Sequence, residues 1–456
     1  MNRGMMRRAG RLSFLALVAL GVAGAAEVPT DRPLTVDECV RIALERSPTI
    51  GRAQAQVQSA EGGRLSSWSG VLPSVSAGAS TGRNTNNRGL RRNVEFQRVI
   101  GDSTIVEIVP ELPIPAYSTN SYSYDVTARS TLLDWGAWRR ISASGARVAG
   151  AEAGEESARE EVAYAVKRQY YEYLRAIKLA EVARDAEGLS QKQLERTDAL
   201  FELGSVTRGD VLSARVTVAQ DELTRISAEN RVEVEQARLA REMGIPVSTP
   251  IEIVQEMGPA KASFDETASD RALALRGDVR QQRYELEGAR ASLSAARGGY
   301  YPSLGMSWNY RWNDNQSPEF FDSFRYNTGW SVFLSLDVPI WDGFATRGSV
   351  TQSKAAVRSQ ERLLRDVELQ AALEIEEARL AIDQAMKQVG SATEGVALAE
   401  ENHRLRQQMY EVGAATLLEV QAAQVDLTRA RVSLIEALAS LRQAEAQYER
   451  VTGAGA

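Results

Sequence analysis

The chain has 456 residues and a formal net charge of −6, a mildly acidic balance that offers no basic surface for nucleic acid. A single cysteine, Cys39, excludes an intrachain disulfide framework, and a single histidine, His403, argues against a histidine-based metal site. The residues contain no phosphate-binding glycine loop, nucleophile elbow or metal-ligand cluster. We therefore predict no cofactor, no bound metal and no enzymatic activity.

The first 26 residues have the pattern of a secretory signal peptide. Arg3, Arg7, Arg8 and Arg11 precede an apolar run over residues 12–22, and four small residues follow it. The alternative is an N-terminal membrane anchor, but the run is shorter than the roughly 20 residues that a spanning helix needs. Without residues 1–26 the net charge becomes −10 because four arginines are removed. No later stretch approaches 18 consecutive apolar residues, so no transmembrane helix is predicted.

From residue 27 onward, one unit occurs twice. Pro73-Ser74 aligns with Pro302-Ser303 at an offset of 229, and residues 201–204 align with residues 410–413 at an offset of 209. The offset falls by about 20 between these points, so the first copy carries a longer loop. We divide the chain into a first repeat at 27–244, a linker at 245–266 that lies around the middle of the helices, and a second repeat at 267–456.

Each repeat is predicted to contain a short helix, two strands, a long helix and a returning helix. In the first repeat we place these elements at 35–67, near 75–79 and 122–128, at 138–203 and at 207–243, with a long loop at 84–120. Thr35 and Glu38 predict a capping box at the first of these helices. In the second repeat we place the corresponding five elements at 269–297, 304–312, 330–340, 346–412 and 416–451. Each long helix would span about 100 Å.

The strand regions have the period and length of membrane-crossing strands. Leu304, Met306 and Trp308 alternate with Gly305, Ser307 and Asn309, which gives one apolar and one polar face. About ten residues suffice for a tilted strand to cross a bilayer, and all seven tryptophans lie in or beside these regions. The alternative is a soluble α+β protein, yet no element is available to cover the apolar faces. Four strands cannot close a barrel, so the protomer must oligomerise; periodicity does not decide between three copies and two or four.

Several paired motifs together resemble the TolC-type outer-membrane efflux protein family, also called outer-membrane factors. They are the Pro-Ser strand starts at Pro73 and Pro302, the strand end Val338-Pro339-Ile340-Trp341-Asp342-Gly343, and the helical turns around Leu203-Gly204 and at 412–420. The resemblance implies an α+β membrane protein with long antiparallel coiled-coil helices that form a periplasmic α-barrel. It also implies a homotrimer whose protomers each give four β-strands to a transmembrane barrel of twelve. The implied role is a passive exit duct of a tripartite efflux or type I secretion system, opened by a periplasmic adaptor and an inner-membrane pump.

The same resemblance implies the position of a periplasmic gate. Asp210 and Tyr410 match the partners of a resting hydrogen bond between neighbouring coils, and Glu419 matches the outer of two acidic rings. Ala415 and Ala422 depart from the family pattern, which has an arginine and a second acid there. The implied adaptor-docking tips are Gly204, Ser205, Val206, Gly413, Ala414 and Ala415.

Local chemistry offers a second interpretation of the acids. Thr207-x-x-Asp210 and Thr416-x-x-Glu419 both read as capping boxes, in which the acid stabilises a helix start. The alternative function is a soluble periplasmic coiled-coil adaptor or scaffold without a pore. The sequence does not specify the exported substrate, the pump or the adaptor.

Overall fold

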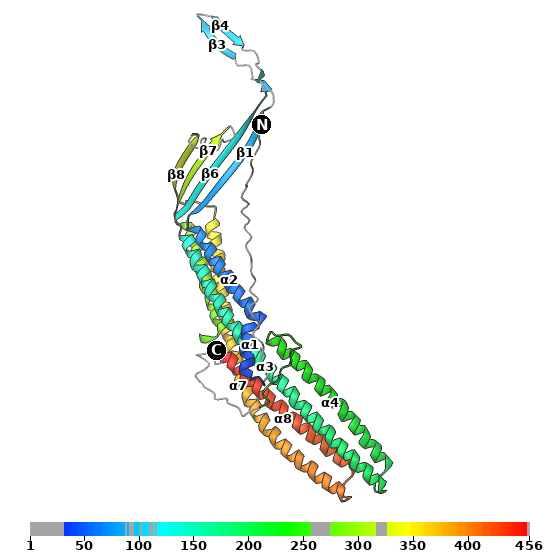
Figure 1. Cartoon of the computed structure of the whole chain (residues 1–456). Helices are drawn as coiled ribbons and strands as arrows, with labels where there is room; N and C mark the ends of the chain where they lie inside the picture. The colour runs from blue at the N-terminus through cyan, green and yellow to red at the C-terminus, as the bar shows by residue number, and fades with distance from the viewer. Residues whose placement is uncertain are drawn as a thin grey trace, which may run out of the picture.

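A computed structural model describes residues 32–86, 89–90, 95–100, 103–108, 113–114, 116–256, 274–315 and 326–453. The expected signal peptide and residues 257–266 of the linker lie outside this range. The chain is elongated, with a β-sheet toward one end and two helical hairpins at the other (Figure 1). In the described residues, no helix combines the length and apolar character needed to span a membrane.

The sheet has four antiparallel strands in the order β1-β6-β7-β8. Their bounds are Ser74–Asn86 for β1, Tyr117–Leu133 for β6, Ser303–Asp314 for β7 and Thr328–Asp337 for β8. The two hairpins, one from each repeat, therefore lie side by side, joined along β6 and β7. Within the chain β1 and β8 are the two edges of this sheet.

The strand register places most of the apolar residues of the four strands on one face; Phe333 is an exception, since it pairs with Ser307 on the other face. Trp308 pairs with Ala128 on β6 and with Val332 on β8, and Tyr310 pairs with Val126 and Trp330. The opposite face carries polar partners, among them the Asp125–Arg311 pair and the hydrogen bond from Thr127 to Asn309 at 2.9 Å. The predicted alternation is confirmed, and it separates a face suited to lipid from a face suited to water.

The hairpin of the first repeat continues beyond the sheet. Short strands pair there as β2 (Gly89–Leu90) with β5 (Pro113–Ile114) and as β3 (Glu95–Ile100) with β4 (Ser103–Ile108). Figure 1 shows this ribbon projecting away from the helices. The segment expected to be a loop is thus partly strand, because its two arms extend the β1–β6 register.

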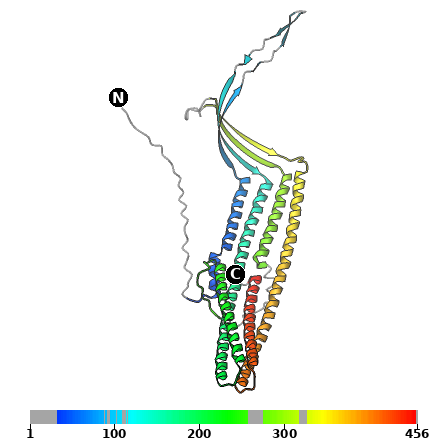
Figure 2. The ribbon, with the colours of Figure 1, turned by 90° about the vertical axis from the view of Figure 1, so that its right-hand side faces the viewer.

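Helices continue from the other end of the strands. α2 (Pro48–Ser67), α3 (Trp135–Glu202), α6 (Gly277–Arg297) and α7 (Ala345–Glu411) run side by side toward the middle of the molecule (Figure 2). α3 and α7 then continue to the tips, where α4 (Arg208–Glu242) and α8 (Leu417–Thr452) return. With 68 and 67 residues, α3 and α7 each span about 100 Å.

The first predicted helix is divided in two. α1 (Val36–Arg46) starts with the predicted capping box of Thr35 and Glu38, but Ser47 is extended, with φ −61° and ψ 126°, before α2 begins at Pro48. A proline disfavours helical geometry in the residue before it, so the break follows from local sterics. The Ser47 hydroxyl then accepts a hydrogen bond from the Thr49 amide and caps α2.

A core at the middle of the molecule joins α1, α3, the end of α4 and residues 245–254. Leu34 forms a parallel β-bridge with Ile253 and packs in the same cluster as Cys39. The hydroxyl of Tyr170 donates to the carbonyls of Val254 (2.9 Å) and Leu34 (3.3 Å), and Tyr173 donates to Ile251 (3.0 Å). These bonds link two side chains of α3 to the backbone of the connecting segment, so α3 holds that segment in place.

Candidate functional site at the helical tips

The two helical hairpins end in turns of the same geometry. At the end of α3, Gly204 donates to the carbonyl of Phe201 and Ser205 to that of Leu200, each at 2.9 Å. At the end of α7, Gly413 donates to Tyr410 (3.0 Å) and Ala414 to Met409 (2.8 Å). This pair of bonds is the Schellman motif, which satisfies the last carbonyls of a helix. Gly204 and Gly413 both have φ +75°, a conformation that favours glycine.

Each returning helix begins with the capping box expected from the sequence. The Asp210 carboxylate accepts hydrogen bonds from the amide and the hydroxyl of Thr207, both at 2.8 Å. The Thr207 hydroxyl in turn accepts from the Asp210 amide at 3.3 Å. Asp210 therefore has a structural role at the start of α4 whatever else it does.

Glu419 has the same arrangement and an additional cation. It accepts hydrogen bonds from the amide (2.8 Å) and hydroxyl (3.2 Å) of Thr416, and Arg406 of α7 donates to its other oxygen at 3.2 Å. The Thr416 amide, the Thr416 hydroxyl and the charge of Arg406 hold the pKa of Glu419 below its usual range. The carboxylate thus stays ionised in mild acid. Sequence reasoning missed Arg406, because its contact with Glu419 depends on how α7 and α8 face each other.

Tyr410 lies in an apolar cluster just before the second turn. Only 8% of its surface is exposed, and it packs with Leu417 and Val420 and with the partly buried Leu200 and Ala415. Within the part of the chain that the structure describes, its hydroxyl has no hydrogen-bond partner. Ala415 therefore contributes to apolar packing at the position where the resemblance implies an arginine.

The structure of one chain does not bring Asp210 and Tyr410 together. The hydrogen-bond partner found for the Asp210 carboxylate is Thr207, and none is found for the Tyr410 hydroxyl among the described residues. The tips also expose two apolar residues that the sequence analysis noted in the turn motifs but did not place among the site residues. Leu203 and Val412, at equivalent places in the two turns, are each 79% exposed. Among the described residues, no group of three or more histidine, cysteine, aspartate or glutamate side chains is arranged to hold a metal.

A family model described as outer membrane efflux protein matches residues 39–244 and 268–454, which is most of the chain. The chain belongs to the outer membrane efflux protein family. The chain is accordingly an outer-membrane protein, and the predicted family and location are confirmed. Protein CyaE of Bordetella pertussis is 28% identical over 218 residues, which are 46% of this chain and 44% of CyaE. The chain spans less than half the length of the curated relatives that it matches.

Solved outer-membrane channels share the fold of this chain. The outer-membrane channel OprN matches with a TM-score of 0.77 at 17% identity, over 92% of this chain and 90% of that one. The CmeC outer membrane channel of Campylobacter jejuni matches with a TM-score of 0.77 at 16% identity, over 92% and 86% of the two chains. The predicted fold class is thereby confirmed at the level of one protomer.

Proposed function

We propose that this efflux protein is a passive exit duct that spans the outer membrane and continues through the periplasm as a helical tunnel. The observation that carries the proposal is the joining of two features in one chain. A sheet with one apolar and one polar face is continuous with helices about 100 Å long. The strands are long enough to cross a bilayer, and the helices are long enough to extend the duct well beyond one side of it. A soluble adaptor would gain nothing from an uncovered apolar sheet face.

Three copies would close the duct. β1 and β8 are the edges of a four-stranded sheet, and open edges do not persist in lipid because each backbone donor and acceptor needs a partner. Pairing β1 of one copy with β8 of the next gives a closed barrel, and three copies give twelve strands. In this assembly the repeats at 27–244 and 267–456, joined by the linker at 245–266, supply alternate hairpins of the tunnel.

The tips are the proposed gate and docking region. Asp210, Tyr410 and Glu419 would line or fasten the constriction, since all three lie at or beside the helical turns. The turn residues Gly204, Ser205, Val206, Gly413, Ala414 and Ala415 would contact a periplasmic adaptor that recruits an inner-membrane pump. The exposed Leu203 and Val412 support this role, because they offer apolar contacts at the very ends of the hairpins.

Cysteine cross-linking at the sheet edges tests the proposed assembly. One cysteine is placed on β1 and one on β8, and the full-length protein is oxidised in outer membranes. We expect disulfide-linked dimers and trimers between chains, without background from the buried Cys39. Cysteines on β6 and β7, which are paired within one chain, should cross-link only internally. A protein that remains in the soluble fraction and never forms intermolecular cross-links would overturn the proposal.

A further inference from the structure

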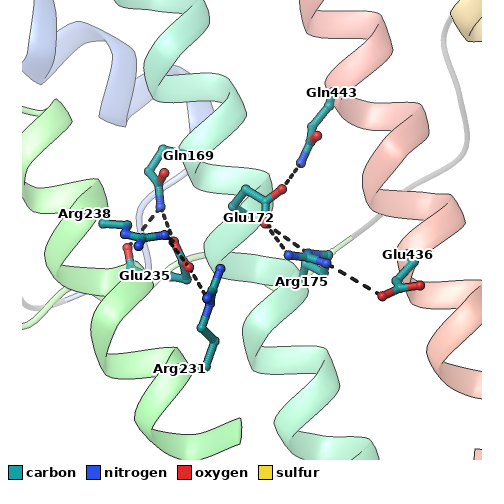
Figure 3. Close-up of polar contacts among 8 residues, drawn as sticks. All are labelled: Gln169, Glu172, Arg175, Arg231, Glu235, Arg238, Glu436 and Gln443. Carbon is teal, nitrogen blue, oxygen red and sulfur yellow. Dashed lines mark hydrogen bonds and ion pairs between the residues drawn. The ribbon is translucent and has the colours of Figure 1, made fainter.

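The helix α3 is shared between the two hairpins of each chain, which we call hairpin 1 (α3 and α4) and hairpin 2 (α7 and α8). Figure 3 shows α3 near the middle of the molecule with polar partners on both sides. Gln169 donates to the Glu235 carboxylate of α4 at 2.9 Å, and Glu172 accepts from Gln443 of α8 at 2.7 Å. The neighbouring Arg175 lies 3.8 Å from Glu436 of α8. Hairpin 2 is thus joined to hairpin 1 by polar contacts at this level.

The same seam continues down α3 toward the tips. The buried Gln424 of α8 donates to the carbonyl of Ala186 at 3.2 Å, and Arg431 lies 3.8 Å from Asp185. At the tip, Arg196 of α3 forms an ion pair with Glu411, the last residue of α7, at 3.2 Å. Arg196 lies about 32 Å along α3 from Arg175, since a helix rises about 1.5 Å per residue. If the hairpin rotates outward about the middle of the molecule, a contact this far from the middle opposes the rotation more effectively than a contact close to it.

The Arg196–Glu411 pair lies beside the gate residues. Leu200, one helical turn after Arg196, packs against the cluster that contains Tyr410, the residue before Glu411. An apolar contact and an ion pair therefore join the same two segments, α3 of hairpin 1 and the end of α7 in hairpin 2. Arg196 thus provides a cationic contact at the tip, whereas Ala415, which occupies the position of the family's arginine, provides none.

The two repeats differ at this pair. The offset of 209 aligns Arg196 with Leu405 and aligns Glu411 with Glu202. In a ring of alternating hairpins, the seam between neighbouring copies would therefore place Leu405 opposite Glu202 and would lack the ion pair. The fastening is confined to the seam inside each protomer.

We infer that the Arg196–Glu411 pair is a latch that holds hairpin 2 against hairpin 1 in the resting channel and must break for the tips to part. This inference rests on the proposed function as a gated duct. The side chains of Arg196 and Glu411 are 38% and 50% exposed, so one pair shifts an equilibrium by only about 1.5- to 5-fold. Three pairs that break together in a trimer shift it by about 3- to 100-fold.

Single-channel recording of the purified full-length protein in planar bilayers tests the latch. The open fraction at fixed voltage should rise by about 3- to 100-fold in R196Q and in E411Q. The double variant R196Q/E411Q should match the single variants, because the same contact is lost in each. The exchange R196E/E411R should return the open fraction toward that of the wild type. Raising salt from 0.1 to 1 M should increase the open fraction of the wild type but not that of R196Q/E411Q, because salt screens the pair.

The matched control is R404Q. Arg404 pairs with Glu401 within α7 at 2.6 Å and lies close to the tip, and its side chain is more exposed than that of Arg196, but this pair lies within one helix. Its loss should leave the open fraction unchanged. The latch is overturned if R196Q and E411Q behave like the wild type in a protein that conducts, or if the charge exchange fails to restore closure. A wild-type protein that never conducts overturns the proposed function itself, so the two failures are distinguishable.

Discussion

A lysine placed on the apolar face of β8 tests the membrane assignment in a way that separates two classes of protein. Leu334 lies near the centre of the apolar run, pairs with Met306 on β7 and is 67% exposed in the chain. In a soluble protein, L334K changes a surface residue, and the free energy of unfolding should move by no more than about 0.5 kcal/mol. On the lipid face of a barrel the same lysine costs about 2–4 kcal/mol near the bilayer centre, or about 6–12 kcal/mol for three chains.

The adjacent Ser335 provides the control. It lies on the opposite face of β8, where it pairs with Gly305, so S335K would project into the water-filled interior. We expect S335K to cost little, since charge is tolerated on the interior face of wide barrels. The assay is a urea titration of folding into lipid vesicles, with the inserted fraction read by protease protection. Equal effects of L334K and S335K would refute the assignment of the two sheet faces.

Two further predictions concern the tip and the middle of the molecule. Because the pKa of Glu419 is held below its ordinary value, the carboxylate stays ionised in mild acid, and its contribution to the capping box is lost only as pH falls through the lowered pKa. Block of the channel by divalent cations at Glu419 should therefore persist at pH 5. It should strengthen in R406Q, which removes the cation that competes for the carboxylate. Single-channel recording with magnesium or calcium measures this, and loss of block already at pH 5–6 would contradict it. Burial raises the pKa of the Cys39 thiol to about 12, so Cys39 should react with thiol reagents only when the middle core opens. Y170F removes the hydroxyl that donates to Val254 and Leu34 and should destabilise that core by about 1–1.5 kcal/mol. Cys39 labelling should then increase about five- to twelvefold, and unchanged labelling would contradict this prediction.

Much of the fold is predictable because its elements have strong periods. The alternation around Trp308 and Val332 determines which face of each strand is apolar, and the observed register aligns these faces across the sheet. The capping boxes at Thr35, Thr207 and Thr416 were also readable, because they depend on residues only three positions apart. The break at Ser47 was missed although Pro48 signals it, since the helical composition on both sides outweighed one residue.

The contacts at the tips were less predictable for a physical reason. The pairs Arg406–Glu419 and Arg196–Glu411 join side chains on different helices, and their meeting depends on the rotation of each helix about its axis. In the sequence, a charged residue that contacts another helix cannot be distinguished from a charged residue that is exposed to solvent. The hydrogen bond that the resemblance implies between Asp210 and Tyr410 is not formed within one chain, because the Tyr410 hydroxyl is buried in an apolar cluster and the Asp210 carboxylate bonds to Thr207.

The most direct test of the central claim is the conductance of the purified full-length protein reconstituted in a planar lipid bilayer. We predict discrete current steps of uniform size, from a complex whose mass corresponds to three copies of the chain. The account is contradicted if the protein is a soluble species that produces no steps at any voltage or salt concentration.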